Sequence, residues 1–216
     1  MLGDEAVQKH SFIQAHGSST PQNRVTESNI FDCVAKAFSI KDWPVTAVKS
    51  YIGHSLAPAS ADQLMATLGV FKHGILPGIK TMDKVAADVN QERLNICLQD
   101  NKRAVGDWEV AFLNSKGFGG NNATATVLSP QVAEKMLNKR YGEDAMKAYL
   151  SKRELTRQQA KDYDDKASRG DLQVIYRFGV DMIDETQIEL NDKTLTMPGF
   201  ENKIPLPQDN PFSDMF

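Results

Sequence analysis

The sequence has only two cysteines, Cys33 and Cys97, among its 216 residues. A disulfide framework or a cysteine-based zinc site needs more cysteines at characteristic spacings, so both are excluded. No apolar run approaches the roughly 20 residues that cross a membrane. The opening MLGDEAVQKH lacks the basic start and apolar centre of a signal peptide. We therefore expect a cytoplasmic protein without a membrane span.

The chain also lacks a basic excess. Its 25 lysines and arginines are outnumbered by 28 acidic residues, and the net charge is −3. Broad nucleic-acid binding needs a basic footprint, so that class of partner is excluded. The 41% of hydrophobic residues is typical of a soluble globular protein, and the length suits one domain with an extension.

The first part of the chain alternates between short apolar runs and helical patterns. We expect strands over residues 11–15 and 45–48 and helices over residues 25–38 and 60–73. The stripe expected to be buried in the first helix is Ile30, Cys33, Val34, Ala37 and Phe38. In the second helix it is Leu64, Leu68 and Phe71, with Ser60 and Gln63 as a capping box and Gly74 as a stop signal.

Three further strands complete an α/β pattern. Residues 94–98 and 108–113 are apolar runs, and a glycine-rich turn then leads into ATATVL, which is rich in β-branched residues. This order predicts a mixed five-stranded sheet with flanking helices.

Beyond residue 130 the composition changes. Residues 131–166 form a charged helical pattern, and the charged run over residues 147–166 is most simply a solvated helix face. Leu172, Val174, Tyr176 and Phe178 alternate with polar residues as in a half-buried strand, and residues 187–190 and 194–197 predict a hairpin. We therefore divide the chain into an α/β domain over residues 1–130 and an α+β extension over residues 131–216.

Polar or glycine-rich segments follow three of the expected strands: AHGSSTP, KSYIGH and KGFGGNN. Two histidines, His16 and His54, offer two imidazole N–H donors for a developing oxyanion, and one such donor is typically worth about 3 kcal/mol. Lys49 would keep a nearby histidine neutral by like-charge repulsion, and Glu27 could hold that lysine in place. A tight glycine turn lets the backbone approach a ligand.

Three motifs occur in order: His-Gly-x-x-Thr-Pro, Lys-x-x-x-x-His and Gly-Phe-Gly-Gly-x-Asn, with a glutamate eleven residues after the first histidine. Over residues 11–127 this pattern resembles the C-terminal half of β-ketoacyl synthases, the decarboxylating condensing enzymes of fatty acid synthesis. The resemblance implies a thiolase-like fold and the condensation of an acyl thioester with a malonyl thioester.

The resemblance also implies roles for individual residues. His16 and His54 are expected to assist decarboxylation and stabilise the enolate, with Lys49 organising the site and Glu27 as its partner. The residues expected to contact the phosphopantetheine arm or the acyl chain are Ser18, Thr20, Phe118, Gly119, Gly120 and Asn122, with Phe118 as the gate of the acyl pocket. No cofactor and no metal are implied.

The sequence departs from the family pattern in four ways. Ser18 replaces a usual threonine, SLAPAS replaces a small-residue helix start after His54, and Asn121 replaces a common threonine. These changes resemble a subgroup of longer bacterial synthases with a C-terminal extension. The fourth departure is an absence: the family has a nucleophilic cysteine in its N-terminal half, and neither Cys33 nor Cys97 corresponds to it.

We therefore expect a chain that is inactive alone and that works with an N-terminal half carrying the cysteine. Its partners would be acyl carrier protein thioesters or acyl-coenzyme A, and the complete enzyme would be a homodimer. The alternative is a non-catalytic partner or split-gene half that contributes structure or carrier-protein docking. A metal site at His16 and His54 lacks a third ligand with recognisable spacing.

Overall fold

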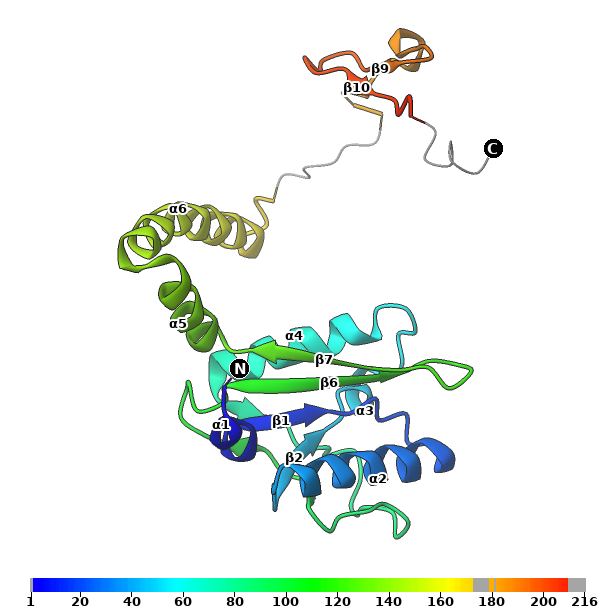
Figure 1. Cartoon of the computed structure of the whole chain (residues 1–216), viewed down its shortest axis with the longest axis vertical. Helices are drawn as coiled ribbons and strands as arrows, with labels where there is room; N and C mark the ends of the chain where they lie inside the picture. Colours follow the sequence, from blue (N-terminus) through cyan, green and yellow to red (C-terminus); the bar gives the residue numbers. More distant parts are fainter. Residues whose placement is uncertain (1, 173–178, 181, 210–216) are drawn as a thin grey trace. The chain divides into compact units, whose positions relative to one another are not determined.

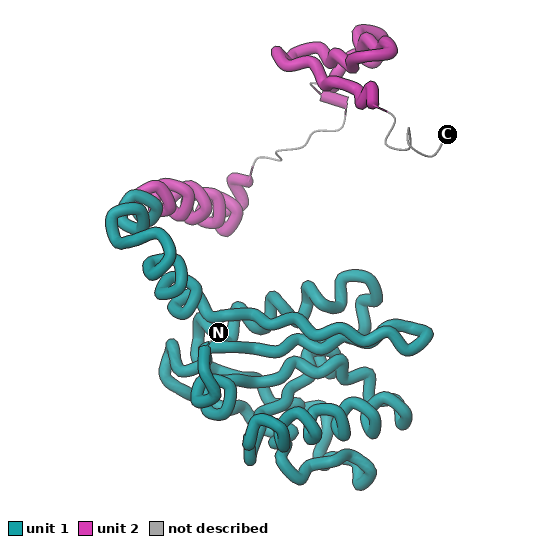
Figure 2. Tube along the Cα trace, viewed as in Figure 1, with its two compact units in different colours: residues 1–150 teal, residues 151–216 magenta. Residues whose placement is uncertain are grey.

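The computed structural model describes residues 2–172, 179, 180 and 182–209. The chain forms two compact units, Met1–Leu150 and Ser151–Phe216 (Figure 2). The strands and helices expected to carry the motifs all lie in the first unit.

A five-stranded sheet organises the first unit (Figure 1). Its strands are, in spatial order, β4 (Leu94–Ile96), β2 (Trp43–Thr46), β1 (Ser11–Gln14), β6 (Val110–Lys116) and β7 (Asn122–Leu128). β1 runs parallel to both β2 and β6, β4 runs parallel to β2, and β7 is antiparallel to β6. The prediction of a mixed five-stranded sheet is confirmed.

Two helices cover opposite faces of this sheet. Adjacent residues of a strand point to opposite faces. Ile13 packs with Phe31 of α2 (Pro21–Ala37), whereas Phe12 packs with Phe71 of α4 (Ala59–His73). Because β1 lies in the middle of the sheet, the loop that follows it is reached from α2 on one face and from α4 on the other.

The start and the buried face of α2 differ from the prediction. The helix begins four residues earlier, at Pro21, where the fixed φ of proline suits the first helical position. Its buried apolar residues are Phe31 and Ala35, whereas Ile30, Val34 and Phe38 are 45%, 37% and 47% exposed. The predicted stripe is therefore wrong, because the packed face also contains polar residues with hydrogen-bond partners.

The buried face of α4 was also predicted wrongly in part. Phe71 is buried as expected, but Leu64 and Leu68 are exposed, and Gln63 and Thr67 are buried instead. The capping box does not form, because the N-cap is Pro58 and the Gln63 amide contacts strand backbone. Gly74 ends the helix in a left-handed conformation, as its position predicted.

The remaining elements are short or peripheral. In the first unit they are α1 (Asp4–Lys9), α3 (Lys49–Ile52), the pair β3 (Ile75–Leu76) and β5 (Asn101–Lys102), and α5 (Pro130–Tyr141). Helix α6 (Glu143–Ser168) follows, and η1 (Glu185–Gln187), β8 (Glu189–Leu190), β9 (Thr194–Thr196) and β10 (Ile204–Pro205) come later.

These elements confirm the charged helical segment and the hairpin of β8 and β9. The alternating strand predicted at residues 172–178 lies, apart from Leu172, outside the described residues. Across the described part of the chain, no helix is long and apolar enough to cross a membrane.

Candidate active site

The structure brings His16 and His54 together. His16 comes two residues after β1 ends, and His54 follows α3 and the turn residue Gly53. Their ring centroids lie 5.1 Å apart and the ring planes meet at 77°. His16 is buried and His54 is exposed, and both line a hollow of about 290 Å³. One small ligand can therefore contact both imidazoles.

Backbone hydrogen bonds fix how the two imidazoles present their nitrogens. The N–H of Lys116 donates to His16 Nδ1 at 3.2 Å, and the N–H of Leu56 donates to His54 Nδ1 at 3.0 Å. In a neutral imidazole the nitrogen that accepts a hydrogen bond carries no proton, so the proton lies on Nε2. Each neutral histidine thus has an Nε2–H donor that its own backbone contacts do not use.

The Glu27 carboxylate holds the loop after β1 in place. Its Oε1 accepts the backbone N–H of His16 at 2.7 Å and the Asn114 side-chain amide at 2.7 Å. Its Oε2 accepts the N–H of Gly17 and the Asn23 side-chain amide, each at 3.0 Å. Gly17 has φ +57°, and a Cβ there would lie 2.6 Å from Cβ of Ala47. This turn therefore needs glycine.

Lys49 lies on α3 and is buried, and its Nζ has no hydrogen-bond partner among the described residues. Burial lowers its pKa, although the charges of Glu27 and Asp62 oppose that shift. No ion pair joins Lys49 to Glu27, whose carboxylate is occupied by four other donors. Lys49 and Glu27 therefore interact only through their charges and not through a direct ion pair.

The pKa of His16 is lowered from its ordinary value. Burial is the larger cause and the charge of Lys49 the next, while the Glu27 carboxylate raises it. The neutral form of His16 is the one that can accept from Lys116 N–H and still donate from Nε2. Electrostatics and hydrogen bonding thus favour the same state of the ring.

A second hollow, of about 580 Å³, adjoins Lys49 and His54. Ser18 lines it, and so does the segment 81–89. A bidentate ion pair between Arg24 and Asp88, with distances of 2.8 and 2.9 Å, ties that segment to α2. Thr20 is the N-cap of α2 and is exposed.

The glycine-rich loop joins β6 to β7 beside the histidines. Gly117, Asn121 and Asn122 line the smaller hollow, whereas Phe118 is 95% exposed. Gly119 and Gly120 have φ values of 81° and 86°, which form the turn. The loop is thus at the wall of the crevice as expected, but the Phe118 side chain is not among the residues that line it.

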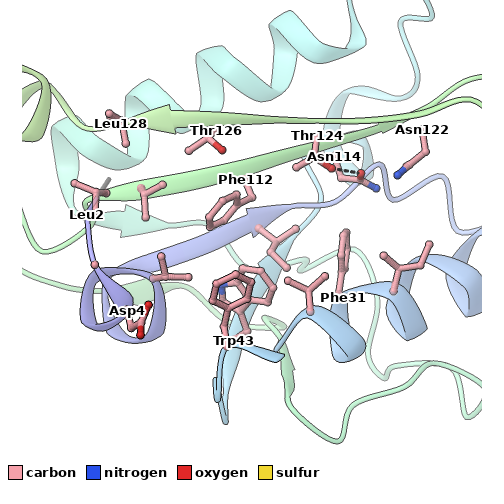
Figure 3. A pocket seen from close by; sticks show the side chains of 17 residues that line it. Leu2, Asp4, Phe31, Trp43, Phe112, Asn114, Asn122, Thr124, Thr126 and Leu128 are labelled. Carbon is pink, nitrogen blue, oxygen red and sulfur yellow. Dashed lines mark hydrogen bonds between the residues drawn. The ribbon is translucent and has the colours of Figure 1, made fainter. Parts of the chain in front are cut away.

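Sequence reasoning missed the amides around this site. Asn114 donates to Glu27, and its Oδ1 accepts from Thr124 Oγ1 at 2.9 Å (Figure 3). Gln63 donates to strand backbone from inside the protein. The signal for Asn114 was present, because it is a polar residue directly after the apolar run WEVAFL.

A largely apolar groove of about 580 Å³ lies between α2 and the strands β6 and β7 (Figure 3). Its walls include Ile30, Val34 and Phe38 on the helix side and Phe112 and Thr126 on the sheet side. Three of the five α2 residues that sequence periodicity assigns to the core thus line this groove.

Neither cysteine is placed to act with the histidines. Cys33 is exposed, and Cys97 is buried, which raises the pKa of its thiol to about 11. Neither is among the residues that line the two hollows beside His54. The described residues contain no group of three or more metal-ligating side chains.

Comparisons with known proteins show which family this chain resembles. Residues 6–83 match the sequence model of the family described as β-ketoacyl synthase, C-terminal domain. The β-ketoacyl-[acyl-carrier-protein] synthase FabY of Pseudomonas aeruginosa is 59% identical over 215 residues, which are 100% of this chain and 34% of that protein. The 3-oxoacyl-[acyl-carrier-protein] synthase 1 of Escherichia coli is 31% identical over 116 residues, 52% of this chain and 26% of that protein.

One solved structure is similar to this chain in fold and sequence. The crystal structure of the noncanonical ketosynthase FabY from P. aeruginosa superposes with a TM-score of 0.83 at 58% identity, covering 100% of this chain and 34% of that one. The predicted thiolase-like α/β fold is therefore confirmed. This chain spans about a third of the length of the Pseudomonas enzyme.

Proposed function

We propose that this chain, which belongs to the β-ketoacyl synthase family, supplies the part of a condensing enzyme's active site that contains the histidines. The reaction is the decarboxylative condensation of an acyl thioester with a malonyl thioester in fatty acid synthesis. The observation that carries this proposal is that the His16 and His54 ring centroids lie 5.1 Å apart and that each neutral ring has an Nε2–H donor with no partner among the described residues.

The two imidazoles act on the malonyl thioester. When its carboxylate leaves as carbon dioxide, the electrons of the broken C–C bond pass into an enolate, whose negative charge lies largely on the thioester oxygen. The Nε2–H groups of His16 and His54 donate to this oxygen, and each donor contributes about 3 kcal/mol. The enolate carbon then attacks the acyl group, and the thiolate that carried the acyl group leaves.

Lys49 and Glu27 prepare His16 for this step. The Lys49 charge disfavours protonation of His16, so the imidazole stays a neutral donor. Glu27 fixes the backbone of His16 through its carboxylate. Ser18 and Thr20 would contact the phosphopantetheine arm, while Phe118, Gly119, Gly120 and Asn122 would border the acyl pocket.

The thiol nucleophile is assigned to a partner segment. Covalent catalysis of acyl transfer needs an activated thiolate, and neither Cys33 nor Cys97 lies at the histidine hollow. We assign it to the N-terminal half of a longer synthase. The substrates would be acyl carrier protein thioesters or acyl-coenzyme A, no cofactor is required, and the complete enzyme would be a cytoplasmic homodimer.

Exposed apolar side chains support such a partner segment. Ile30, Val34 and Phe38 of α2 line an open groove, and Met65 of α4 is 68% exposed. Apolar patches of this kind commonly mark interfaces. We also keep the boundary at residue 130 as a proposal, with residues 131–216 as an extension of the catalytic domain.

A second candidate is a non-catalytic half that contributes structure or carrier-protein docking. The positions of Cys33 and Cys97 favour it, because this chain by itself has no thiol at the site.

Substitutions in the complete synthase distinguish the catalytic function from the non-catalytic one. His16→Ala and His54→Ala should each lower kcat on the order of 100-fold, as loss of an oxyanion donor does. His73→Ala, at the exposed end of α4, is the matched control and should leave kcat unchanged. Full activity in both site variants would establish the non-catalytic alternative.

A further inference from the structure

Gln63 is buried more completely than any group at the histidine site. Its relative exposure is 0%, and it lies on the first turns of α4. Its Nε2 lies 2.8 Å from the carbonyl oxygen of Ala15 and 3.0 Å from that of Asn114, and the carbonyl of Gln14 is a longer contact at 3.3 Å. An amide has two N–H hydrogens. The two shorter contacts account for both of them.

The first of these hydrogen bonds acts on the peptide group that precedes His16. The carbonyl of Ala15 accepts from Gln63, and the N–H of His16 in the same peptide group donates to Glu27. Gln63 comes from α4 and Glu27 from α2, which cover opposite faces of the sheet. One peptide plane is therefore held from both faces.

The second hydrogen bond acts on the end of β6. Gln63 binds the carbonyl of Asn114, and its Oε1 accepts from Ser115 Oγ at 3.3 Å. The next residue, Lys116, donates its N–H to His16 Nδ1. Gln63 thus fixes the strand that orients the imidazole as well as the peptide that carries it.

We propose that Gln63 is a positioning residue that sets the place and the ring orientation of His16 by tying the ends of β1 and β6 to α4. It does not touch the hollow, since the residues lining that hollow do not include it. The catalytic consequence rests on the proposed function, because the group it positions is the proposed oxyanion donor.

The test is Gln63→Met, which keeps the length and volume of the side chain and removes both donors and the acceptor. Thr67→Val is the matched control: Thr67 is also fully buried, one turn along α4, and its hydroxyl has no partner in the described part of the chain. Amide hydrogen exchange in the folded chain is the first readout, and it needs no substrate.

In Gln63→Met the amides of His16 and Lys116 should exchange at least about tenfold faster, while core amides such as that of Val45 change little. Thr67→Val should leave all of them unchanged. A uniform loss of protection over the sheet, or unchanged protection at His16 and Lys116, would overturn the proposal. Should Gln63→Met fail to fold, Gln63→Asn keeps an amide but withdraws it by one methylene, and the same selective loss is expected.

The second readout is the kinetics of the complete synthase. Misplacing a catalytic group by about 1 Å can cost on the order of 100-fold, so Gln63→Met should lower kcat by 10- to 100-fold with KM for the malonyl thioester nearly unchanged. Unchanged kcat together with the selective exchange effect would contradict the catalytic role of His16, but not the positioning role of Gln63. Unchanged exchange at His16 and Lys116 would contradict the positioning role of Gln63 itself.

Discussion

Glu27 Oε1 accepts the backbone N–H of His16 at 2.7 Å, although the two residues are eleven positions apart. Glu27 is 4% exposed, and four donors surround its carboxylate: two backbone N–H groups and two asparagine side chains. A buried carboxylate is tolerated only with such partners. Glu27 therefore joins α2, β6 and the loop after β1.

Glu27→Gln should destabilise the first unit strongly. A glutamine has one acceptor oxygen, and its NH₂ group would face N–H donors. Hydrogen bonds to a charged group are worth about 1.5–3 kcal/mol, so the free energy of unfolding should fall by about 3 kcal/mol. Urea unfolding followed by tryptophan fluorescence measures it, because Trp43 and Trp108, the two tryptophans of the chain, are buried in this unit.

Glu92→Gln is the matched control for that substitution. Glu92 is exposed and pairs with Arg93 at 2.6 Å. Exposed pairs are worth less than about 1 kcal/mol. Equal losses in the two variants would contradict the account of Glu27.

The architecture was readable from the sequence, but the packed faces of its helices were not. Alternating strand and helix patterns gave the sheet and both helices. The periodicity of α2 then selected Ile30 and Val34, which line an open groove, over the buried Phe31 and Ala35. Apolar residues at an interface and in a core have the same pattern. Polar residues that are buried with hydrogen-bond partners, such as Asp32 with Arg93, leave no periodic pattern in the sequence that marks them as buried.

Lys49→Met should stabilise the folded chain at pH 7 while it impairs catalysis in the complete synthase. Folding buries the Lys49 side chain, and its Nζ has no hydrogen-bond partner among the described residues. Removing such a group should raise the free energy of unfolding by about 1 kcal/mol.

The advantage of Lys49→Met should disappear at alkaline pH. The folded-state pKa of Lys49 is lowered from its ordinary value. Between the two values the unfolded chain binds more protons, so the stability of the wild type rises with pH across that window. Urea unfolding at several pH values measures this. A variant less stable than the wild type at pH 7 would contradict the account.

Phe118→Ala should leave stability unchanged within about 0.5 kcal/mol, as expected for an exposed substitution. Its side chain is 95% exposed at the tip of the β6–β7 loop. In the complete synthase the same variant should alter the preference among acyl chain lengths, because we assign Phe118 to the acyl pocket. Product chain lengths identical to those of the wild type would remove it from the site.

The candidate site, like the fold, could be predicted from the sequence only in part. Motif order identified both histidines, and the structure brings them together. The spacing of Ser60 and Gln63 predicts a helix cap, because local spacing alone cannot show that the Gln63 amide reaches strand ends about 50 residues away in the chain. The absence of an ion pair between Lys49 and Glu27 was equally hidden, since it depends on which donors fill the carboxylate.

The central claim is that this chain holds the histidines of a condensing enzyme and not its nucleophile. It is tested most directly by the release of labelled carbon dioxide and the formation of ketoacyl product. The chain is assayed alone and mixed with the N-terminal part of a matching synthase. We predict no condensation by the chain alone, condensation by the mixture, and nearly unchanged turnover when the mixture contains Cys33→Ser. Condensation by the isolated chain that Cys33→Ser abolishes would contradict the account.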